Sequence, residues 1–198
     1  IENVGTQLLA DFSGIGIPKA RICSQFLENL GFKTKIIEVP FMDCIPSGGW
    51  ADSMKILLFG VDNISARRAI DPNEFFIVLD GGTNGQIELF DSCTIRNLKL
   101  TTKTPKEIWP ENTNPTHITH KNLQKMLENN GQCGQLVHPQ ISTPFVGLFC
   151  ASLLISELVR SINRGTGNSA LSVQMNSLES MNFGTKHQYD TQFIALGI

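Results

Sequence analysis

The stretch that most constrains the fold of this chain lies at residues 54–83. Two short apolar runs, 55–60 (KILLFG) and 75–79 (FFIVL), flank a segment with the composition of a short helix, 64–70 (ISARRAI). Short apolar runs of this kind are typical of strands buried on both faces, and strand, helix and strand in this order form a parallel βαβ unit. The sequence therefore predicts an α/β fold with a Rossmann-like, mostly parallel sheet and flanking helices.

A carboxylate follows the first of these two strands. Asp62 comes directly after the first apolar run, and the second run closes at a predicted glycine turn, Asp80-Gly81-Gly82-Thr83. Open α/β sheets bind their ligands at the carboxyl ends of the strands, so Asp62 is placed to hold a divalent cation. The residues alone leave a second interpretation open, in which Asp62 or Asn63 only caps the following helix.

Basic residues at two places suit the binding of an anion. The glycines of segment 14–16 precede a predicted helix start, where free backbone N–H groups and the charge of Lys19 can bind phosphate. A plain loop is the alternative there. Arg67 and Arg68 follow on the short helix of the βαβ unit, and they can bind phosphate, pair across a subunit interface or face solvent.

The remaining elements are predicted from periodicity. Residues 86–90 and 94–100 alternate in polarity, which indicates antiparallel strands added to the sheet. The longest apolar stretch, 145–159, is too short for a membrane span and carries Ser152, Ser156 and Glu157, so a buried helix is predicted over 144–163. The other predicted elements are a helix from 18 to 30, a strand over 33–39, a crossing loop over 101–117, a helix over 119–128 and a last strand over 171–175.

Composition bounds the class of protein. With 198 residues, 41% of them hydrophobic and 17% charged, the chain fits one globular domain over 1–198, with a crossing and cysteine loop region at 101–134. The net charge of −2 argues against a nucleic-acid-binding surface. No signal peptide is recognisable and no membrane contact is expected.

The cysteines indicate a reducing compartment. Five cysteines are an odd number, and no Cys-x-x-Cys pair occurs, which favours free thiols in a cytoplasmic protein. Cys23 and Cys150 fall on predicted helices and are expected to be small core residues. Cys133 lies in a break rich in glycine and asparagine, where its thiolate can be reached, although an inert thiol fits that position too.

Taken in order, five segments between about Ile1 and Gly165 resemble the motifs of the ThiF/MoeB/HesA family, the ubiquitin-activating-type adenylyltransferases. The similar segments are Asn3-Val4-Gly5-Thr6-Gln7, Gly16-Ile17-Pro18-Lys19-Ala20, Val61-Asp62-Asn63 with Arg67, Asp80-Gly81-Gly82-Thr83, and Cys133 followed by Pro144-Phe145-Val146-Gly147.

The resemblance implies a function. Asn3, Gln7 and Lys19 are expected to bind the phosphates of ATP, and Asp62 to hold Mg²⁺. The C-terminal glycine of a ubiquitin-like or sulfur-carrier protein is expected to attack ATP and form an acyl adenylate, and Cys133 then to take the acyl group as a thioester. The family also implies a homodimer. Many of its members bind zinc through Cys-x-x-Cys pairs, which are absent, so no structural zinc is expected.

Two departures from the family pattern leave an alternative open. The glycine-rich nucleotide loop is expected before residue 1, and Thr6 stands where an arginine is usual. The chain is therefore predicted to be part of an active enzyme, or else a degenerate, non-catalytic module for dimerisation or carrier docking. A nicotinamide-dependent oxidoreductase ranks last, because it requires a Gly-x-Gly-x-x-Gly fingerprint that these residues lack.

Overall fold

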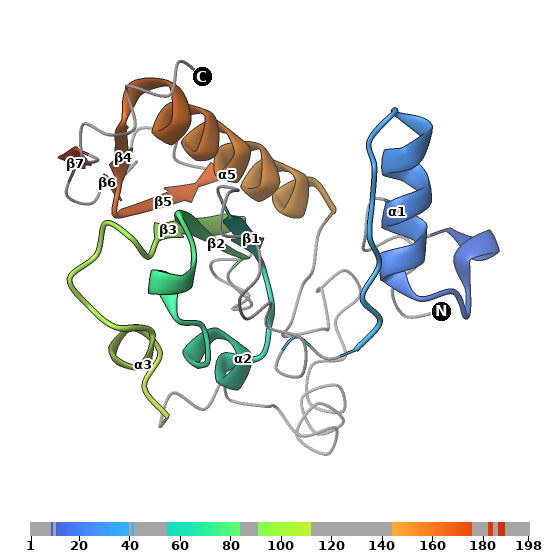
Figure 1. Ribbon diagram of the computed structural model, residues 1–198, viewed down its shortest axis with the longest axis horizontal. Helices are drawn as coiled ribbons and strands as arrows, with labels where there is room; N and C mark the ends of the chain where they lie inside the picture. Colours follow the sequence, from blue (N-terminus) through green and yellow to red (C-terminus); the bar gives the residue numbers. More distant parts are fainter. Residues whose placement is uncertain are drawn as a thin grey trace, which may run out of the picture.

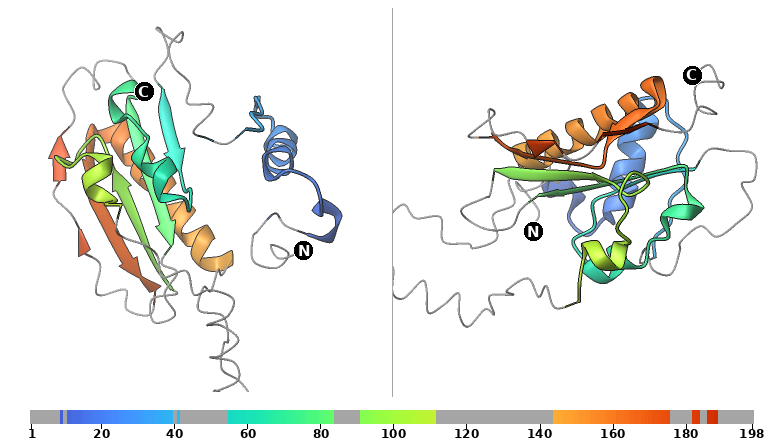
Figure 2. Two further views of the ribbon diagram at one scale, coloured as in Figure 1. Left: turned by 90° about the horizontal axis from the view of Figure 1, so that it is seen from below. Right: turned by 90° about the vertical axis from the view of Figure 1, so that its left-hand side faces the viewer.

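The computed structural model describes residues 9, 11–39, 41, 55–83, 91–111 and 144–175, together with the backbone of 182–183 and 186–188. Its centre is a mixed β-sheet (Figure 1). The long helix α5 (Pro144–Arg164) crosses one face of this sheet, and the short helices α2 (Ile64–Arg68) and α3 (Pro105–Ile108) lie on the other, as Figure 2 shows from the side. The fold is therefore a layered, mixed α/β arrangement.

The described sheet is mostly antiparallel, so the prediction of a mostly parallel sheet is wrong for this part of the chain. Its strand order is β1-β2-β3-β5-β6, and only the first pair, β1 and β2, is parallel. The pairs β2 with β3, β3 with β5, and β5 with β6 are all antiparallel. The strands are β1 (Ile56–Phe59), β2 (Ile77–Thr83), β3 (Ser92–Asn97), β5 (Ala170–Gln174) and β6 (Asn182–Phe183).

The predicted βαβ unit is present. Strand β1, helix α2 and strand β2 follow one another in that order, and Ile56 pairs in parallel register with Ile77. Two details differ from the prediction. Strand β1 is at the edge of the described sheet, so Ile56 is 38% exposed rather than buried. Strand β2 continues through Thr83, so the expected glycine turn at 80–83 is in fact paired with β3.

Each face of the sheet carries its own core. Between the sheet and α5, one cluster combines alternate residues of the strands with the buried side of the helix. Under the other face, a second cluster packs around Trp109, which follows α3. The first consists of Ile77, Leu79, Cys93, Ile95, Cys150, Leu154, Leu171 and Val173. The second consists of Phe59, Ile70, Phe75, Val78, Leu98 and Trp109.

Helix α5 confirms the predicted long helix almost residue for residue. It begins at Pro144, ends at Arg164, and is followed by Gly165, whose φ of 60° is the left-handed conformation that ends helices. Its length and composition are also sufficient to cross a membrane, which is weak evidence because core helices pass the same test. The residues of its buried side are Val146, Cys150, Leu154, Glu157 and Ser161.

Helix α1 (Lys19–Asn29) also confirms its prediction, and Gly31, with φ 90°, ends it. It lies apart from the sheet (Figures 1 and 2). The strand predicted over 33–39 is not formed, because a strand needs a neighbour for its backbone groups and none pairs with it among the described residues. Cys23 is exposed, so its predicted place in the core is wrong.

Other predictions meet the structure only in part. The crossing loop over 101–117 contains helix α3, because Thr104 and Glu107 form a reciprocal capping box that starts it. A further two-stranded sheet pairs β4 (Thr166–Asn168) with β7 (Lys186–Gln188). The predicted strand 86–90 and helix 119–128 lie outside the described residues, as do Asn3, Gln7 and Cys133.

Candidate functional site

A cleft of about 440 Å³ opens where β1 and β2 end. One wall comes from β1 and the turn after it, and the opposite wall comes from the first half of α5. Most of the lining is apolar, and its charged groups are Asp62 and Arg67. The lining residues are Leu58, Phe59, Gly60, Val61, Asp62, Arg67, Gly81, Gly82, Thr83, Gly147, Cys150, Ala151, Leu154 and Ile155.

Asn63, not Asp62, caps helix α2. The side-chain oxygen of Asn63 accepts hydrogen bonds from the backbone N–H groups of Ser65, at 2.8 Å, and Ala66, at 3.4 Å. These bonds satisfy donors that the first turn of a helix leaves free. Asp62 is therefore released from the capping role that competed with ligand binding, and its exposed carboxylate lines the cleft.

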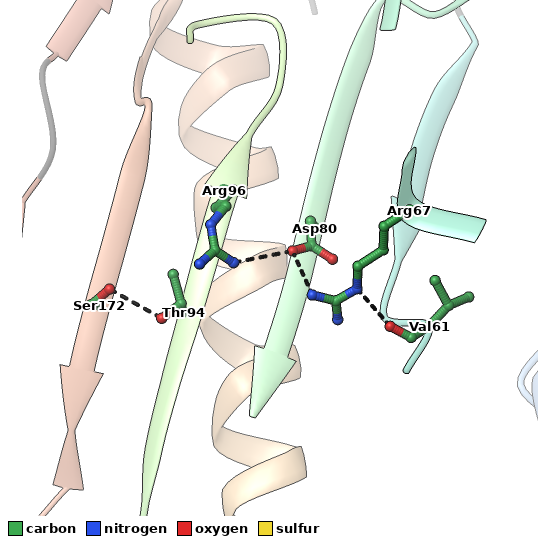
Figure 3. Close-up of polar contacts among 6 residues, drawn as sticks. All are labelled: Val61, Arg67, Asp80, Thr94, Arg96 and Ser172. Atoms are coloured by element: carbon green, nitrogen blue, oxygen red, sulfur yellow. Dashed lines mark hydrogen bonds and ion pairs between the residues drawn. The ribbon is translucent and has the colours of Figure 1, made fainter. Parts of the chain in front are cut away.

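Arg67 holds the turn that carries Asp62. Its Nε donates to the backbone oxygen of Val61 over 2.6 Å, and its Nη1 lies 3.4 Å from Oδ2 of Asp80 on β2. Gly82 is close enough that a Cβ there would lie 3.2 Å from Nη2 of Arg67. One guanidinium thus connects the turn after β1 to the middle of β2 (Figure 3).

Asp80 lies between two arginines (Figure 3). It is fully buried, and Nη1 of Arg96, on β3, also lies 3.4 Å from its Oδ2. Both guanidinium groups stack over the ring of Trp109, with centroid distances of 5.5 Å for Arg67 and 5.8 Å for Arg96. Stacking on an aromatic face suits the planar guanidinium, so Trp109 fixes both cations beside the carboxylate.

The buried carboxylate is incompletely compensated. Oδ1 of Asp80 has no hydrogen-bond partner among the described residues. Burial raises the pKa of Asp80, because the charged form loses its hydration, and the positive charges of Arg67 and Arg96 offset only part of that rise. The stability of the fold is therefore linked to the protonation of Asp80.

This linkage predicts a specific pH dependence. Because the pKa of Asp80 is higher in the folded than in the unfolded protein, its protonation stabilises the fold fully below the unfolded value of about 4. That contribution is lost as the pH rises through the folded pKa. In urea unfolding across this range, the free energy of unfolding of the unchanged protein minus that of Asp80→Asn is expected to fall with rising pH. A difference that rises with pH would contradict the assignment.

The thiol in the cleft wall is not suited to nucleophilic chemistry. Cys150 is buried, and its thiol hydrogen-bonds with that of Cys93. This hydrogen bond and burial together raise the pKa of Cys150, and a thiol that stays protonated is a poor nucleophile. The prediction of Cys150 as a core residue is confirmed, and the cleft offers no other thiol among its described lining residues.

The structure brings together only part of the predicted site. Asp62 lines the cleft, whereas no residue of α1, and so not Lys19, is among its lining. The described residues contain no group of three His, Cys, Asp or Glu side chains able to hold a metal on their own. Mg²⁺ commonly uses one or two carboxylates and takes its other ligands from phosphates and water, so the single free carboxylate of Asp62 fits this role.

Sequence reasoning missed the supporting residues of the site. Arg67 was considered for phosphate, a subunit interface or solvent, but it pairs with a carboxylate of its own chain. Asp80 was assigned to a turn, and no signal pointed to Arg96 or Trp109, which lie far along the chain. In the antiparallel register of β2 and β3, Arg96 lies opposite Asp80. The polar and apolar alternation of β3 was visible in the sequence, but its register against β2 was not.

Comparison with known proteins identifies relatives. The family model for the BilD C-terminal domain matches residues 1–165. A protein of Collimonas sp. (strain OK412), named bacterial E1-like protein BilD, is 31% identical over 195 residues. This match covers 93% of the chain and 41% of the relative, so the chain spans less than half of that protein's length. The family match ends just after α5, although β5, beyond it, pairs with β3 in the central sheet.

Proposed function

Because the chain belongs to the BilD C-terminal domain family, we propose that it contributes the Asp62 side of an E1-like, ATP-dependent adenylation site. The observation that supports this proposal is the free carboxylate of Asp62 in the cleft, with the capping role taken by Asn63. The name of the Collimonas relative agrees with an activating function. The motifs shared with the ThiF/MoeB/HesA family supply the finer statement of the reaction.

The proposed reaction is an attack at phosphorus. A carboxylate oxygen of the C-terminal glycine of a ubiquitin-like or sulfur-carrier protein bonds to the α-phosphorus of ATP. The bond from that phosphorus to the bridging oxygen of pyrophosphate breaks, which gives an acyl adenylate and pyrophosphate. Mg²⁺, when bound, neutralises phosphate charge. The protein's contribution is positioning and charge, as in other transfers at phosphorus.

Within the described cleft, Asp62 would be the metal ligand and Arg67 the residue that positions it. Arg67 binds the backbone oxygen of Val61, the residue directly before Asp62, so it limits movement of the turn. Nε and Nη1 of Arg67 bind acceptors of the protein itself and its guanidinium stacks on Trp109, so we assign Arg67 to support of the turn rather than to substrate binding. Asp62 remains as the acidic group that faces the cleft.

The nucleotide phosphates are proposed to meet residues beyond the described cleft. Asn3, Gln7 and Lys19 are the proposed phosphate contacts, and Cys133 is the proposed acceptor in a second step. In that step the Cys133 thiolate attacks the acyl carbon, the bond from this carbon to the AMP oxygen breaks, and AMP leaves as a thioester forms. If the reaction stops at the acyl adenylate, Cys133 is not needed.

The exposed edge of β1 supports the proposal that another strand pairs with β1 and completes the site. Ile56 and Leu58 are each 38% exposed, and β1 has a neighbour on one side only in the described sheet. Apolar edge strands of this kind are usually covered or paired. We propose that a further parallel strand pairs here and makes the whole arrangement Rossmann-like, with its nucleotide-binding loop beside Asp62.

Exchange of pyrophosphate into ATP tests the proposal. With the full-length protein and its carrier, Asp62→Asn is expected to lower the rate of exchange about 100-fold, because a fixed charge near the reacting phosphates contributes an effect of this size. Asp71→Asn is the matched control, since Asp71 is an exposed aspartate that caps a short 3-10 turn outside the cleft. The control is expected to keep the rate.

The alternative of a non-catalytic docking module makes the opposite prediction. It is favoured by one observation, that the described cleft is lined by a single free carboxylate and by no residue of α1. A module of this kind would show neither exchange nor Mg²⁺-dependent ATP binding by calorimetry, while still binding its carrier. Exchange that is unaffected by Asp62→Asn would overturn the proposed role of Asp62 itself.

A further inference from the structure

Two thiols from distant parts of the chain meet between helix α5 and the sheet. Cys93 lies on β3 and Cys150 on α5, and both are free and buried in the core cluster between these elements. Their thiols hydrogen-bond with each other. Neither thiol has a part in the proposed adenylation, so the pair calls for an explanation of its own.

A glycine lets the sulfur of the helix reach the sheet at this point. A Cβ built on Gly81 of β2 would lie 3.3 Å from Sγ of Cys150. In the antiparallel register of β2 and β3, Thr83 lies opposite Cys93. Gly81 is two residues before Thr83, so Cys93 is its diagonal neighbour on the same face of the sheet. The absence of a side chain at Gly81 therefore places the Cys150 sulfur at the surface of the sheet, beside Cys93.

The cleft leads to this pair of thiols. Cys150 lines the cleft, and so does Thr83, the residue opposite Cys93. Cys93 and Cys150 are only 2% and 6% exposed, so a small oxidant that enters the cleft has better access to them than a bulky disulfide has. Hydrogen peroxide is an oxidant of suitable size, because it is little larger than a water molecule.

The hydrogen bond gives the two thiols different roles. Donation by the Cys150 thiol lowers the pKa of Cys93, although burial opposes this effect. The same hydrogen bond and burial raise the pKa of Cys150. The thiolate is the nucleophilic form of cysteine, so Cys93 is the sulfur that attacks first and Cys150 is the thiol that responds.

We infer that Cys93 and Cys150 form a reversible disulfide, made by hydrogen peroxide, that joins α5 to β3. The Cys93 thiolate attacks one peroxide oxygen, the O–O bond breaks, and the departing hydroxide takes up the Cys93 proton as water. The Cys150 sulfur then attacks the sulfur of the resulting sulfenic acid. The S–O bond breaks, and the second hydroxide leaves with the Cys150 proton as water. Two thiols are thus oxidised to one disulfide, and one peroxide is reduced to two water molecules.

This disulfide would move one wall of the cleft. A sulfur–sulfur bond of about 2.05 Å is much shorter than a hydrogen bond between thiols, so α5 has to shift toward β3 when the bond forms. Helix α5 carries Gly147, Ala151 and Ile155 of the cleft lining, and the opposite wall comes from β1. Oxidation would therefore alter the cleft beside Asp62. This effect on adenylation rests on the proposed function, whereas the disulfide itself does not.

Peptide mapping tests the disulfide in the full-length protein. The protein is treated with hydrogen peroxide, its remaining thiols are blocked with N-ethylmaleimide, and it is digested without reduction by trypsin and chymotrypsin. Cleavage after Phe145 separates Cys150 from Cys133. Mass spectrometry is expected to find the Cys93 peptide linked to the Cys150 peptide, at least tenfold faster than in the same protein unfolded in urea. No such link in the folded protein, or an equal rate in the unfolded protein, would overturn the inference.

Pyrophosphate exchange tests the effect on the cleft. Peroxide is expected to lower the exchange rate of the full-length protein at least tenfold, and dithiothreitol to restore it. Cys93→Ser is the matched control, because residue 93 does not line the cleft, and its exchange is expected to resist peroxide. Far-ultraviolet circular dichroism checks its folding, and Cys93→Ala is a second variant without the thiol.

The outcomes separate this inference from the proposed adenylation. Full exchange in protein that carries the disulfide, or an equal loss of exchange in Cys93→Ser, would refute control of the cleft by this pair. Absence of exchange in both the reduced and the oxidised protein would instead refute the proposed adenylation. The peptide map would still decide whether the disulfide forms.

Discussion

Replacement of Glu157 by alanine is expected to destabilise the fold by about 3–5 kcal/mol, because it leaves buried donors unpaired and opens a cavity. Glu157 is 2% exposed on the sheet side of α5. Its Oε1 accepts from the backbone N–H of Asn168 over 2.5 Å, and its Oε2 accepts from Nδ2 of Asn168 over 3.2 Å. This carboxylate attaches α5 to β4. The change is measured as the free energy of unfolding in urea.

Glu157→Gln is the matched control, with the same shape and no charge. In the structure, Oδ1 of Asn168 has no hydrogen-bond partner among the described residues. Rotation of the Asn168 amide by half a turn would let Oδ1 accept from the new glutamine amide, while the glutamine oxygen still accepts from the Asn168 N–H. We therefore expect a loss of about 1 kcal/mol, within the range for one altered hydrogen bond. Equal losses for alanine and glutamine would show that the carboxylate charge matters more than the pairing.

Replacement of Arg67 by alanine is expected to cost about 3 kcal/mol of folding free energy, near the lower end for breaking a buried ion pair, since Arg96 still faces Asp80. The guanidinium side chain is 14% exposed and Asp80 is fully buried, so the remaining carboxylate cannot be hydrated without local opening. Thermal and urea unfolding measure this loss. In the full-length protein, pyrophosphate exchange is also expected to fall, because the turn that carries Asp62 loses its support.

Arg67→Lys separates charge from geometry. A lysine keeps the positive charge but has all three N–H donors on one nitrogen, so it does not reproduce the two separate nitrogens with which Arg67 binds the Val61 oxygen and the Asp80 carboxylate. Compared with Arg67→Ala, this variant is expected to regain part of the lost free energy of unfolding but little of the lost rate of pyrophosphate exchange. Arg21→Ala is the control, because Arg21 pairs with Glu38 on the exposed side of α1. No change in unfolding is expected from it, and full exchange in Arg67→Lys would contradict the positioning role.

Local pattern was enough to predict several elements of this protein. The apolar runs of β1 and β2 and the periodicity of α5 were correct, because a buried strand or helix face requires apolar side chains at a fixed interval. Proline and glycine at the ends of α1 marked its boundaries, since each restricts or frees the backbone there. The strand predicted over 33–39 was wrong because local pattern does not show whether a pairing strand is present. Its alternation suits a strand, but a strand forms only beside a partner.

The candidate site was also predicted only in part from the sequence. Asp62 was predicted from its place after a strand, and the choice between ligand and helix cap stayed open. The structure resolves the cap in favour of Asn63, because its side-chain oxygen is the one in hydrogen-bonding reach of the first turn of α2. Cys133, Asn3 and Gln7 lie outside the described residues, so their roles remain predictions.

The sequence by itself determined which segments become β1, α2, β2 and α5 and placed an acidic residue at the end of a strand, since these features depend on neighbours within a few residues. Only the tertiary structure decided that the described sheet turns antiparallel after β2, that Arg67, Asp80, Arg96 and Trp109 meet, and that one apolar side of α5 is about half exposed. Those outcomes depend on contacts between residues far apart in the chain. Their energies are set by burial and by distance in space, which a one-dimensional pattern does not contain.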